Sequence, residues 1–266
     1  LFENYQTLDG STLFLGAFFF TIQIYGDFSG YSDIAIGCAR LFGIDLMQNF
    51  KYPYFSRDIA EFWRRWHISL TTWFRDYIYI PLGGSRAGKW KSFRNTLVIF
   101  LVSGFWHGAN WTFVAWGAYH ALLFLPLLLL GQNRRYRDSV AENSFLPSVK
   151  ELTQMGATFL LVLLGWILFR SEDISQAAVY LERMFNVSLF SAPQLVGLGF
   201  GQLLLKKCFF FTALMFVVEW IGRKQAHGLM IEDLSLPVRY VIYTVLLIII
   251  YGFDASNPQG FIYFQF

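Results

Sequence analysis

Charged side chains are scarce in this sequence. They make up 15% of its 266 residues, whereas apolar residues account for 55% and aromatic residues for 20%. Soluble globular domains rarely combine so little charge with so much apolar surface. The net charge of +3 is modest, and the basic residues gather at the ends of apolar runs. The composition therefore predicts a membrane protein with several spans and gives no support to nucleic acid as a partner.

Cysteine is scarce as well, with only Cys38 and Cys208, both in apolar segments. We interpret them as small buried hydrophobic residues that carry no information about redox compartment. Several enzyme patterns are missing: there is no nucleophile elbow, P-loop or HExxH motif. No second histidine, cysteine or carboxylate stands at ligand spacing from a histidine, so we predict no metal site.

A signal-peptide pattern and a starting methionine are also missing, and the chain begins at LFENYQ. We expect residues 1–266 to form a single membrane domain that is the C-terminal portion of a longer protein, without its N-terminal spans.

The longest lipid-compatible stretch is residues 97–130, where His107 and His120 are the only ionisable side chains. As one helix it would be about 50 Å long, against a hydrocarbon core of about 30 Å. It must therefore bend or break, and the glycines at residues 104 and 108 lower the cost of leaving helical geometry. Non-helical backbone at membrane depth has to be packed in protein or line a wet cavity. We expect His107 at that place.

His107 has neighbours that would suit an active site. Ser103, Trp106 and Asn110 can satisfy backbone groups that a break leaves unpaired. The surrounding aromatic residues make the setting dry enough to hold an imidazole neutral, which is the form a general base requires. From the residues alone, a buried structural histidine is an equally good interpretation. His120 is most simply a packed residue bonded to a neighbouring helix.

Residues 57–80 predict an amphipathic helix that lies in the membrane interface. The apolar residues at 59, 62, 63, 66, 70, 73, 74 and 77 follow helical spacing, and charged residues, Arg64 among them, lie on the other side. His67 falls just outside the edge of the apolar stripe. A histidine in that position is more often structural than catalytic, so the pattern alone favours a structural role.

Further apolar segments predict spans and a short helix, at residues 11–26, 152–169, 208–222 and 240–253 and near 175–185 respectively. Asp27 and Asp33 follow the first span; they either face a bundle interior or mark a helix end in water. The basic residues between 86 and 94 favour lipid head groups, although the phosphates of a donor would suit them too. The Lys and Arg residues near the ends of the predicted spans weakly place the loops 131–151 and 222–239 in the cytoplasm.

Three stretches of the sequence resemble the membrane-bound O-acyltransferases. They are GDFSGYSDIAIG (26–37), EFWRRWHISLTTWFRDYIYIPLGG (61–84) and SGFWHGANWTFVAWGAYHA (103–121). Within that family the chain is similar to the bacterial branch of alginate and peptidoglycan O-acetylation proteins and of teichoic acid D-alanyl transfer proteins. The closing FIYFQF resembles that branch too, and the similarity covers essentially the whole chain.

The resemblance implies an all-α polytopic membrane protein, with spanning, re-entrant and interfacial amphipathic helices around a central tunnel. It implies the bacterial cytoplasmic (inner) membrane as the location, membrane lipid as a neighbour, and no bound cofactor. The donor would be acetyl-coenzyme A or another cytoplasmic acyl thioester. The acceptor would be a hydroxyl of an extracytoplasmic polysaccharide, or a periplasmic acetyltransferase partner that receives the acyl group.

The resemblance matches His107 to the family's catalytic histidine and His67 to its second required histidine. His107 would act as general base on an acceptor hydroxyl that attacks the thioester, and His67 would orient substrate or stabilise the developing oxyanion. The candidate substrate-binding residues are Ser103, Trp106, Asn110, Arg64 and Asp27.

Two other classes of protein stay open. One is a transporter or channel in which His107, Asp27 and Asp33 form a proton or substrate path. The other is a membrane scaffold with structural histidines. Within the enzyme interpretation, D-alanyl transfer to teichoic acid is the alternative to acetyl transfer, and the sequence does not name the acceptor.

Overall fold

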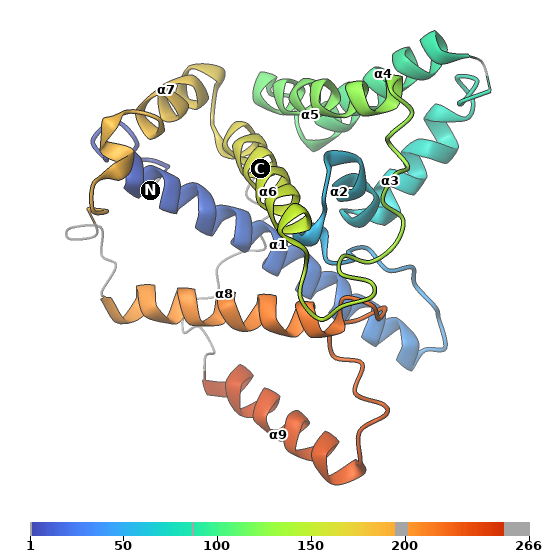
Figure 1. Ribbon diagram of the computed structural model, residues 1–266, viewed down its shortest axis with the longest axis vertical. Helices are drawn as coiled ribbons and strands as arrows, with labels where there is room; N and C mark the ends of the chain where they lie inside the picture. Colours follow the sequence, from blue (N-terminus) through green and yellow to red (C-terminus); the bar gives the residue numbers. More distant parts are fainter. Residues whose placement is uncertain (1, 87, 195–201, 253–266) are drawn as a thin grey trace.

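A computed structural model describes residues 2–86, 88–194 and 202–252 (Figure 1). Every element in these residues is a helix, and in chain order they are α1 (Gly10–Leu41), η1 (Pro53–Phe55), α2 (Ile59–Arg65), α3 (Ile68–Phe74), η2 (Arg75–Tyr79), α4 (Lys89–His107), α5 (Trp111–Leu129), α6 (Val149–Arg170), α7 (Ile174–Met184), η3 (Val187–Phe190), α8 (Gln202–Gly222) and α9 (Leu236–Gly252). The predicted all-α class is confirmed for this part of the chain.

The long helix α1 and the helix α6 form the centre of the fold. In Figure 1, α1 crosses the molecule with α6 beside it, the α4–α5 pair above and α8 below. Leu13 and Ile24 of α1 pack in one core with Leu163 and Ile167 of α6, and all four side chains are fully buried. Aromatic side chains from α2, α5 and α7 complete this core. It is this core that positions the elements around the histidines.

The ends of these helices follow ordinary capping chemistry. Asp9 begins α1 by accepting a hydrogen bond from the Thr12 backbone N–H at 2.9 Å. Ser148 begins α6 with a capping box, in which the Glu151 side chain accepts from the Ser148 backbone N–H at 3.0 Å. Such caps satisfy the backbone donors that a helix start leaves unpaired, so the boundaries are fixed locally.

The break in the central apolar stretch is confirmed. The helix α4 ends at His107, and α5 begins at Trp111 after Asn110, whose Oδ1 accepts from the Thr112 backbone N–H at 3.1 Å. Gly104, which we expected to share the break, stays inside α4. Its role is close packing: a side chain there would collide with the carbonyl oxygen of Phe113. The break therefore lies at Gly108 and turns α4 and α5 into an antiparallel pair.

The predicted amphipathic helix is wrong in one respect, because it is not continuous. The helix α2 ends at Arg65, and α3 begins at Ile68 after His67, whose φ of 45° and ψ of 55° lie in the left-handed region. The main chain of residues 49–51 runs alongside and supplies the missing hydrogen bonds: the Ile68 N–H donates to Asn49 O, and the Lys51 N–H donates to Arg65 O, both at 2.9 Å. A tertiary strand-like contact thus overrides the helical pattern.

Helices form over each of the other predicted spans within the described residues. Two of the described helices, α5 and α6, are long and apolar enough to cross a membrane, and α9 is a shorter apolar helix. The first predicted span extends to Leu41 as part of α1, and the short helix near residue 180 is α7. The end of the predicted span 240–253 lies outside the described residues. Cys38 is exposed, which corrects its interpretation as a buried residue.

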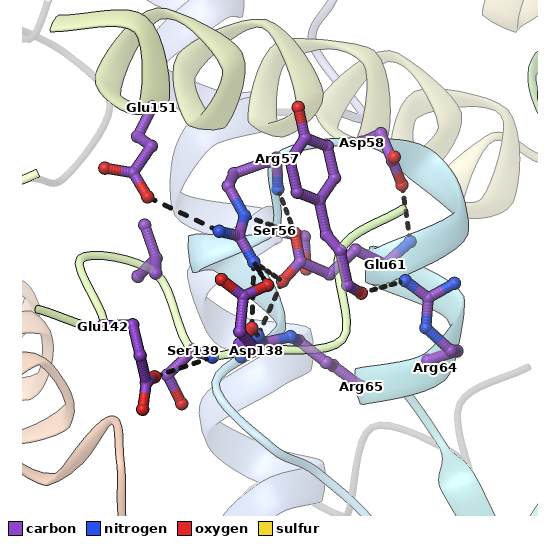
Figure 2. A network of polar contacts seen from close by, with 12 residues as sticks. Ser56, Arg57, Asp58, Glu61, Arg64, Arg65, Asp138, Ser139, Glu142 and Glu151 are labelled. Atoms are coloured by element: carbon purple, nitrogen blue, oxygen red, sulfur yellow. Dashed lines mark hydrogen bonds and ion pairs between the residues drawn. The ribbon is translucent and has the colours of Figure 1, made fainter. Parts of the chain in front are cut away.

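A buried ion network ties α2 to the loop before α6 (Figure 2). The Arg57 guanidinium donates to Glu61 Oε1 at 3.0 Å and to Oε2 at 3.1 Å, and the two side chains are 3% and 1% exposed. The same guanidinium contacts Asp138 at 3.1 Å and Glu151 at 3.4 Å. Arg65 adds a second cation on Glu61 at 2.6 Å. Because Glu61 precedes His67 by less than two turns, this network also fixes the α2–α3 joint.

The close packing of α4 on α5 gives a first prediction. In Gly117→Ala the added Cβ would collide with the carbonyl oxygen of Phe100. We expect a loss of about 1–3 kcal/mol in unfolding free energy, as is usual for overpacking, measured as a lower unfolding temperature of the full-length protein in detergent. Gly156→Ala is the control, since its Cβ would meet open space on α6. An unfolding temperature for Gly117→Ala equal to that of the control would contradict this packing.

The ion network gives a second prediction. Arg57→Met should destabilise the full-length protein by about 3–5 kcal/mol, because it leaves a buried carboxylate short of a partner. Arg75→Gln removes the cation of an exposed pair with Asp76, whose side chains are 59% and 41% exposed, and should leave the unfolding temperature unchanged. Denaturant or thermal unfolding in the same detergent measures both variants. If the two substitutions changed the unfolding temperature equally, the buried network would contribute nothing to stability.

Candidate active site

His67 and His107 line one cavity of about 360 Å³. His67 comes from the α2–α3 joint and His107 from the last residue of α4. Ser103, one turn earlier on α4, lines the same cavity. Trp106 does not line the cavity, but its ring contacts both imidazoles, with centroid distances of 6.3 Å to His67 and 4.9 Å to His107. The structure therefore brings these four sequence candidates together.

Aromatic rings enclose the His107 imidazole. The ring of Trp116 from α5 stands edge-on at 5.2 Å, and the ring of Phe169 from α6 at 5.1 Å. His107 itself is half-buried. These walls limit water around the imidazole while one side of it remains on the cavity, as a base that meets its substrate in a dry site requires.

Asn49 holds His67 in place. His67 Nδ1 lies 3.1 Å from Asn49 Oδ1, and the same oxygen accepts from the Ser69 hydroxyl at 2.9 Å and from the Ser69 backbone N–H at 3.3 Å. Asn49 Nδ2 donates to the Ser32 hydroxyl at 3.1 Å. One asparagine thus joins α1 to the start of α3 and orients the histidine ring between them.

These contacts define which nitrogen of His67 carries the proton. The Ser69 backbone N–H can only donate, so the Asn49 atom that faces it is the oxygen. An amide oxygen can only accept, and His67 Nδ1 must therefore be the protonated nitrogen. In the neutral ring the lone pair is then on Nε2, which has no hydrogen-bond partner among the described residues.

Burial and backbone geometry also set the state of His67. Burial lowers the pKa of His67 from its ordinary value to about 4, so the ring is neutral near pH 7. A non-glycine residue in the left-handed region costs about 1–3 kcal/mol, which surrounding contacts must offset. The Asn49 contact and the Phe28 ring, 4.8 Å from the imidazole, provide such contacts.

Two tryptophans of the cavity lining have buried donors without a partner. Trp63 and Trp116 both line the cavity, and their buried indole Nε1–H groups have no hydrogen-bond partner among the described residues. Buried indoles usually find an acceptor. Because these nitrogens are buried, an acceptor atom in the cavity would reach them only after the indole rings turn toward it.

His120 differs from its prediction. It is fully buried and packs against Trp63 and Trp116 at centroid distances of 5.0 and 5.1 Å. Neither ring nitrogen has a hydrogen-bond partner in the described part of the chain, so the predicted bond to a neighbouring helix is wrong. The break at Gly108 also brings His107 and His120 into contact with the same side chain, Trp116. One straight helix would have kept the two histidines apart.

Three exposed arginines line the cavity. Arg64, Arg75 and Arg134 line it and are exposed at the surface. The Arg64 guanidinium donates to the carbonyl oxygens of Asn133 and Tyr136, each at 2.5 Å, which fixes its position. The loop that contains Arg134 is one that the distribution of cations weakly placed in the cytoplasm. The cavity lining thus carries exposed positive charge and suits an anionic ligand.

The structure does not bring Asn110 and Asp27 into the cavity. The Asn110 side chain caps α5, and its Nδ2 donates to the Glu172 carbonyl oxygen at 2.7 Å. Asp27 lies on the exposed side of α1. In residues 2–86, 88–194 and 202–252, no three histidine, cysteine or carboxylate side chains converge to hold a metal ion.

Sequence reasoning missed Asn49 and Trp116. Asn49 lies in a segment that interrupts the apolar pattern, and its only signal was a polar side chain shortly before Pro53. Its pairing with His67 depends on the left-handed turn, which no periodicity predicts. Trp116 lies within an apolar run, where a cavity-lining side chain cannot be distinguished from a lipid-facing one.

Known proteins match this chain over most of its length. Residues 2–145, more than half of the chain, match the family described as MBOAT, membrane-bound O-acyltransferase family. The chain is 43% identical over 196 residues to a probable alginate O-acetylase of Pseudomonas aeruginosa, covering 72% of this chain and 36% of that protein. It is 36% identical over 187 residues to the peptidoglycan O-acetyltransferase of Helicobacter pylori, covering 70% and 34%.

A more limited similarity extends to D-alanyl transfer. The teichoic acid D-alanyltransferase of Streptococcus thermophilus is 40% identical over 108 residues, covering 38% of this chain and 26% of that protein. The chain spans about a third of the length of the O-acetylating relatives described above. The family match includes His67, His107, Trp63 and Trp116. The chain therefore belongs to the membrane-bound O-acyltransferase family.

Proposed function

We propose that this chain carries the reaction centre of an O-acyltransferase of the bacterial cytoplasmic membrane. The enzyme moves an acyl group, most simply acetyl, from a cytoplasmic thioester such as acetyl-coenzyme A to a hydroxyl. The hydroxyl belongs to an extracytoplasmic polysaccharide or to an intermediate partner that carries the acyl group onward. The observation that carries the proposal is one cavity with two imidazoles, His67 and His107, and three exposed arginines in its lining.

The donor would enter through the arginines. Phosphate groups of a coenzyme pair well with guanidinium groups, and Arg64, Arg75 and Arg134 are exposed along the cavity. The apolar interior would then accept the thioester end. A tunnel that continues past His107 would admit the acceptor from the other compartment.

His107 acts as general base in this scheme. Its imidazole takes the proton of the acceptor hydroxyl as the oxygen attacks the thioester carbonyl, and a tetrahedral oxyanion forms. The carbon–sulfur bond then breaks, and the leaving thiolate recovers the proton from the imidazolium. The products are an ester and a thiol, and no cofactor is consumed.

The Asn49 contact favours an orienting role for His67. With Nδ1–H donated to Asn49, neutral His67 presents a lone pair at Nε2 and can accept from a hydroxyl. It cannot donate to an oxyanion from that nitrogen unless it is protonated, and burial disfavours protonation. The unpaired indole N–H groups of Trp63 and Trp116 are candidate oxyanion donors, and their rings would have to turn toward the cavity to reach the oxyanion.

The relatives support acetyl over D-alanyl. The O-acetylating proteins of P. aeruginosa and H. pylori match 72% and 70% of this chain at 43% and 36% identity. The D-alanyltransferase of S. thermophilus matches 38% of it at 40% identity, and that of Bacillus subtilis matches 58% at 30% identity. The acceptors in the names of the two O-acetylating relatives, alginate and peptidoglycan, are both extracytoplasmic polysaccharides. We therefore propose an acceptor of that class.

A third prediction tests the base. His107→Ala in the full-length protein should lower acyl transfer by about 10²- to 10⁴-fold, the usual effect of losing a positioned base, and leave expression and membrane insertion intact. Thiol release from acetyl-coenzyme A and ester on the polymer measure the reaction, and the membrane-bound amount of protein is the control.

Full activity of His107→Ala would refute this role. Solute or charge movement in proteoliposomes without thioester consumption would indicate a transporter instead. Complementation of a deletion strain by the double variant His67→Ala, His107→Ala would indicate a scaffold.

A fourth prediction concerns Asn49 as a positioning residue. Asn49→Ala should lower kcat by about tenfold, the equivalent of one orienting hydrogen bond, with a smaller change in KM. Asn49→Asp places a negative charge beside His67, which favours the protonated ring and raises its pKa. Activity should therefore be lost at a higher pH than in the parent as the pH is lowered.

Asn186→Ala is the matched control for these variants. Asn186 Oδ1 also accepts from a serine backbone N–H, that of Ser188 at 2.7 Å, but within the turn after α7. It should keep the parent's kcat and pH profile. If Asn49→Asp and the parent had the same acid limb, Asn49 would have no influence on the ionisation of His67.

A further inference from the structure

A second cavity, of about 560 Å³, lies apart from the two motif histidines. The second half of α1, the segment before η1, the helix α8 and the loop after α8 enclose it. Its size is that of a site for a small molecule or a head group. Its polar lining residues are Tyr25, Ser29, Asp33, Arg40, Gln48, Tyr52, Glu219 and His227. None of these has a part in the proposed acyl transfer.

Two buried polar atoms at this cavity have no partner. Glu219 Oε1 accepts from the Tyr25 hydroxyl, but Oε2 is buried without a hydrogen bond in the described part of the chain. The Tyr52 hydroxyl is likewise buried and unpaired, on a residue that is only 5% exposed. The Tyr52 ring lies against Gly228 on the cavity wall, 3.9 Å from where a Cβ would stand. Buried groups of this kind normally have partners.

When Glu219 is ionised, its unpaired oxygen and the oxygen of the Tyr52 hydroxyl can both accept from a positively charged donor. An ionised carboxylate oxygen can only accept, and Asp33, whose carboxylate lies 3.6 Å from His227 Nδ1, adds a second acceptor on the same cavity. The aromatic rings of Tyr25, Phe50 and Tyr52 line the same space, and such rings attract cations. A primary ammonium carries one charge and three N–H donors, which match this set of acceptors.

We propose that this cavity binds the head group of a membrane phospholipid that carries a primary ammonium. The ammonium would lie beside the carboxylates of Glu219 and Asp33, and the buried Glu219 Oε2 and Tyr52 hydroxyl would turn toward it on binding. Arg40 lines the cavity and is exposed at its edge, where a lipid phosphate would lie.

The surroundings of the cavity favour a lipid over a soluble amine. The helices that enclose it carry exposed apolar side chains, with Leu41 of α1 85% exposed and Val217 and Ile221 of α8 55% and 65% exposed. Acyl chains could cover such surfaces in a protein of a membrane-bound family. A head group in the cavity and acyl chains along α1 and α8 would use both features of this surface.

Lipid competition on the full-length protein tests this proposal. Phosphatidylethanolamine, phosphatidylcholine and phosphatidylglycerol with identical acyl chains are supplied in equal amounts, and native mass spectrometry measures which lipid stays bound. We expect phosphatidylethanolamine to be retained about tenfold over both others, because the quaternary ammonium of phosphatidylcholine has no N–H donor. Glu219→Gln and Tyr52→Phe should each reduce this preference severalfold.

Asp45→Asn is the matched control, since Asp45 is an exposed carboxylate in the same segment but outside the cavity. It should keep the parent's preference. Tyr52→Phe keeps the ring, so it remains informative if Glu219→Gln misfolds. Equal retention of the three lipids, or an unchanged preference in Tyr52→Phe, would overturn the proposal. If soluble glycerophosphoethanolamine displaced the bound phosphatidylethanolamine completely, the ligand would be a soluble amine and not a membrane lipid. The readout is binding, so it does not depend on the acyltransferase assignment.

Discussion

The pairing of residues 49–51 with residues 65–68 is the contact on which the site depends. Two backbone hydrogen bonds of 2.9 Å close the chain on itself there, and they force the turn that a continuous amphipathic helix would not make. The turn takes His67 off the helix surface and directs it to the cavity. The Asn49 side chain then sets the tautomer, so one segment controls both the position and the chemical state of the ring. The buried Arg57–Glu61 pair anchors the helix that leads into this turn.

The break at Gly108 supplies the other half of the site. It ends α4 at His107 and folds α5 back along α4, so that Trp116 meets the imidazole. Glycines at 104 and 117 allow the two helices to approach closely. The rings of Trp106, Trp116 and Phe169 therefore pack against the histidine at this helix end. A dry wall and exposed arginines belong to one cavity, which is the arrangement that acyl transfer from an anionic donor would use.

Much of this was predictable from the sequence, and the remainder has a physical reason. Length and hydropathy predicted the helices, and the excess length of residues 97–130 predicted the break beside His107. Periodicity failed at His67, because the competing interaction came from residues distant in the chain. It could not reveal Asn49 or the unpaired indoles of Trp63 and Trp116, since a side chain's partners depend on tertiary packing. Asn110 was predicted both as a backbone partner and as a substrate contact, and the structure shows the first of these.

The central claim is that the acyl donor meets both histidines in one cavity. A cryo-electron microscopy structure of the full-length protein with a non-hydrolysable thioether analogue of acetyl-coenzyme A tests it most directly. The acyl end should lie between His67 and His107, with the phosphates beside Arg64 and Arg134. An analogue bound elsewhere, or one whose acyl end reaches neither imidazole, would contradict the account.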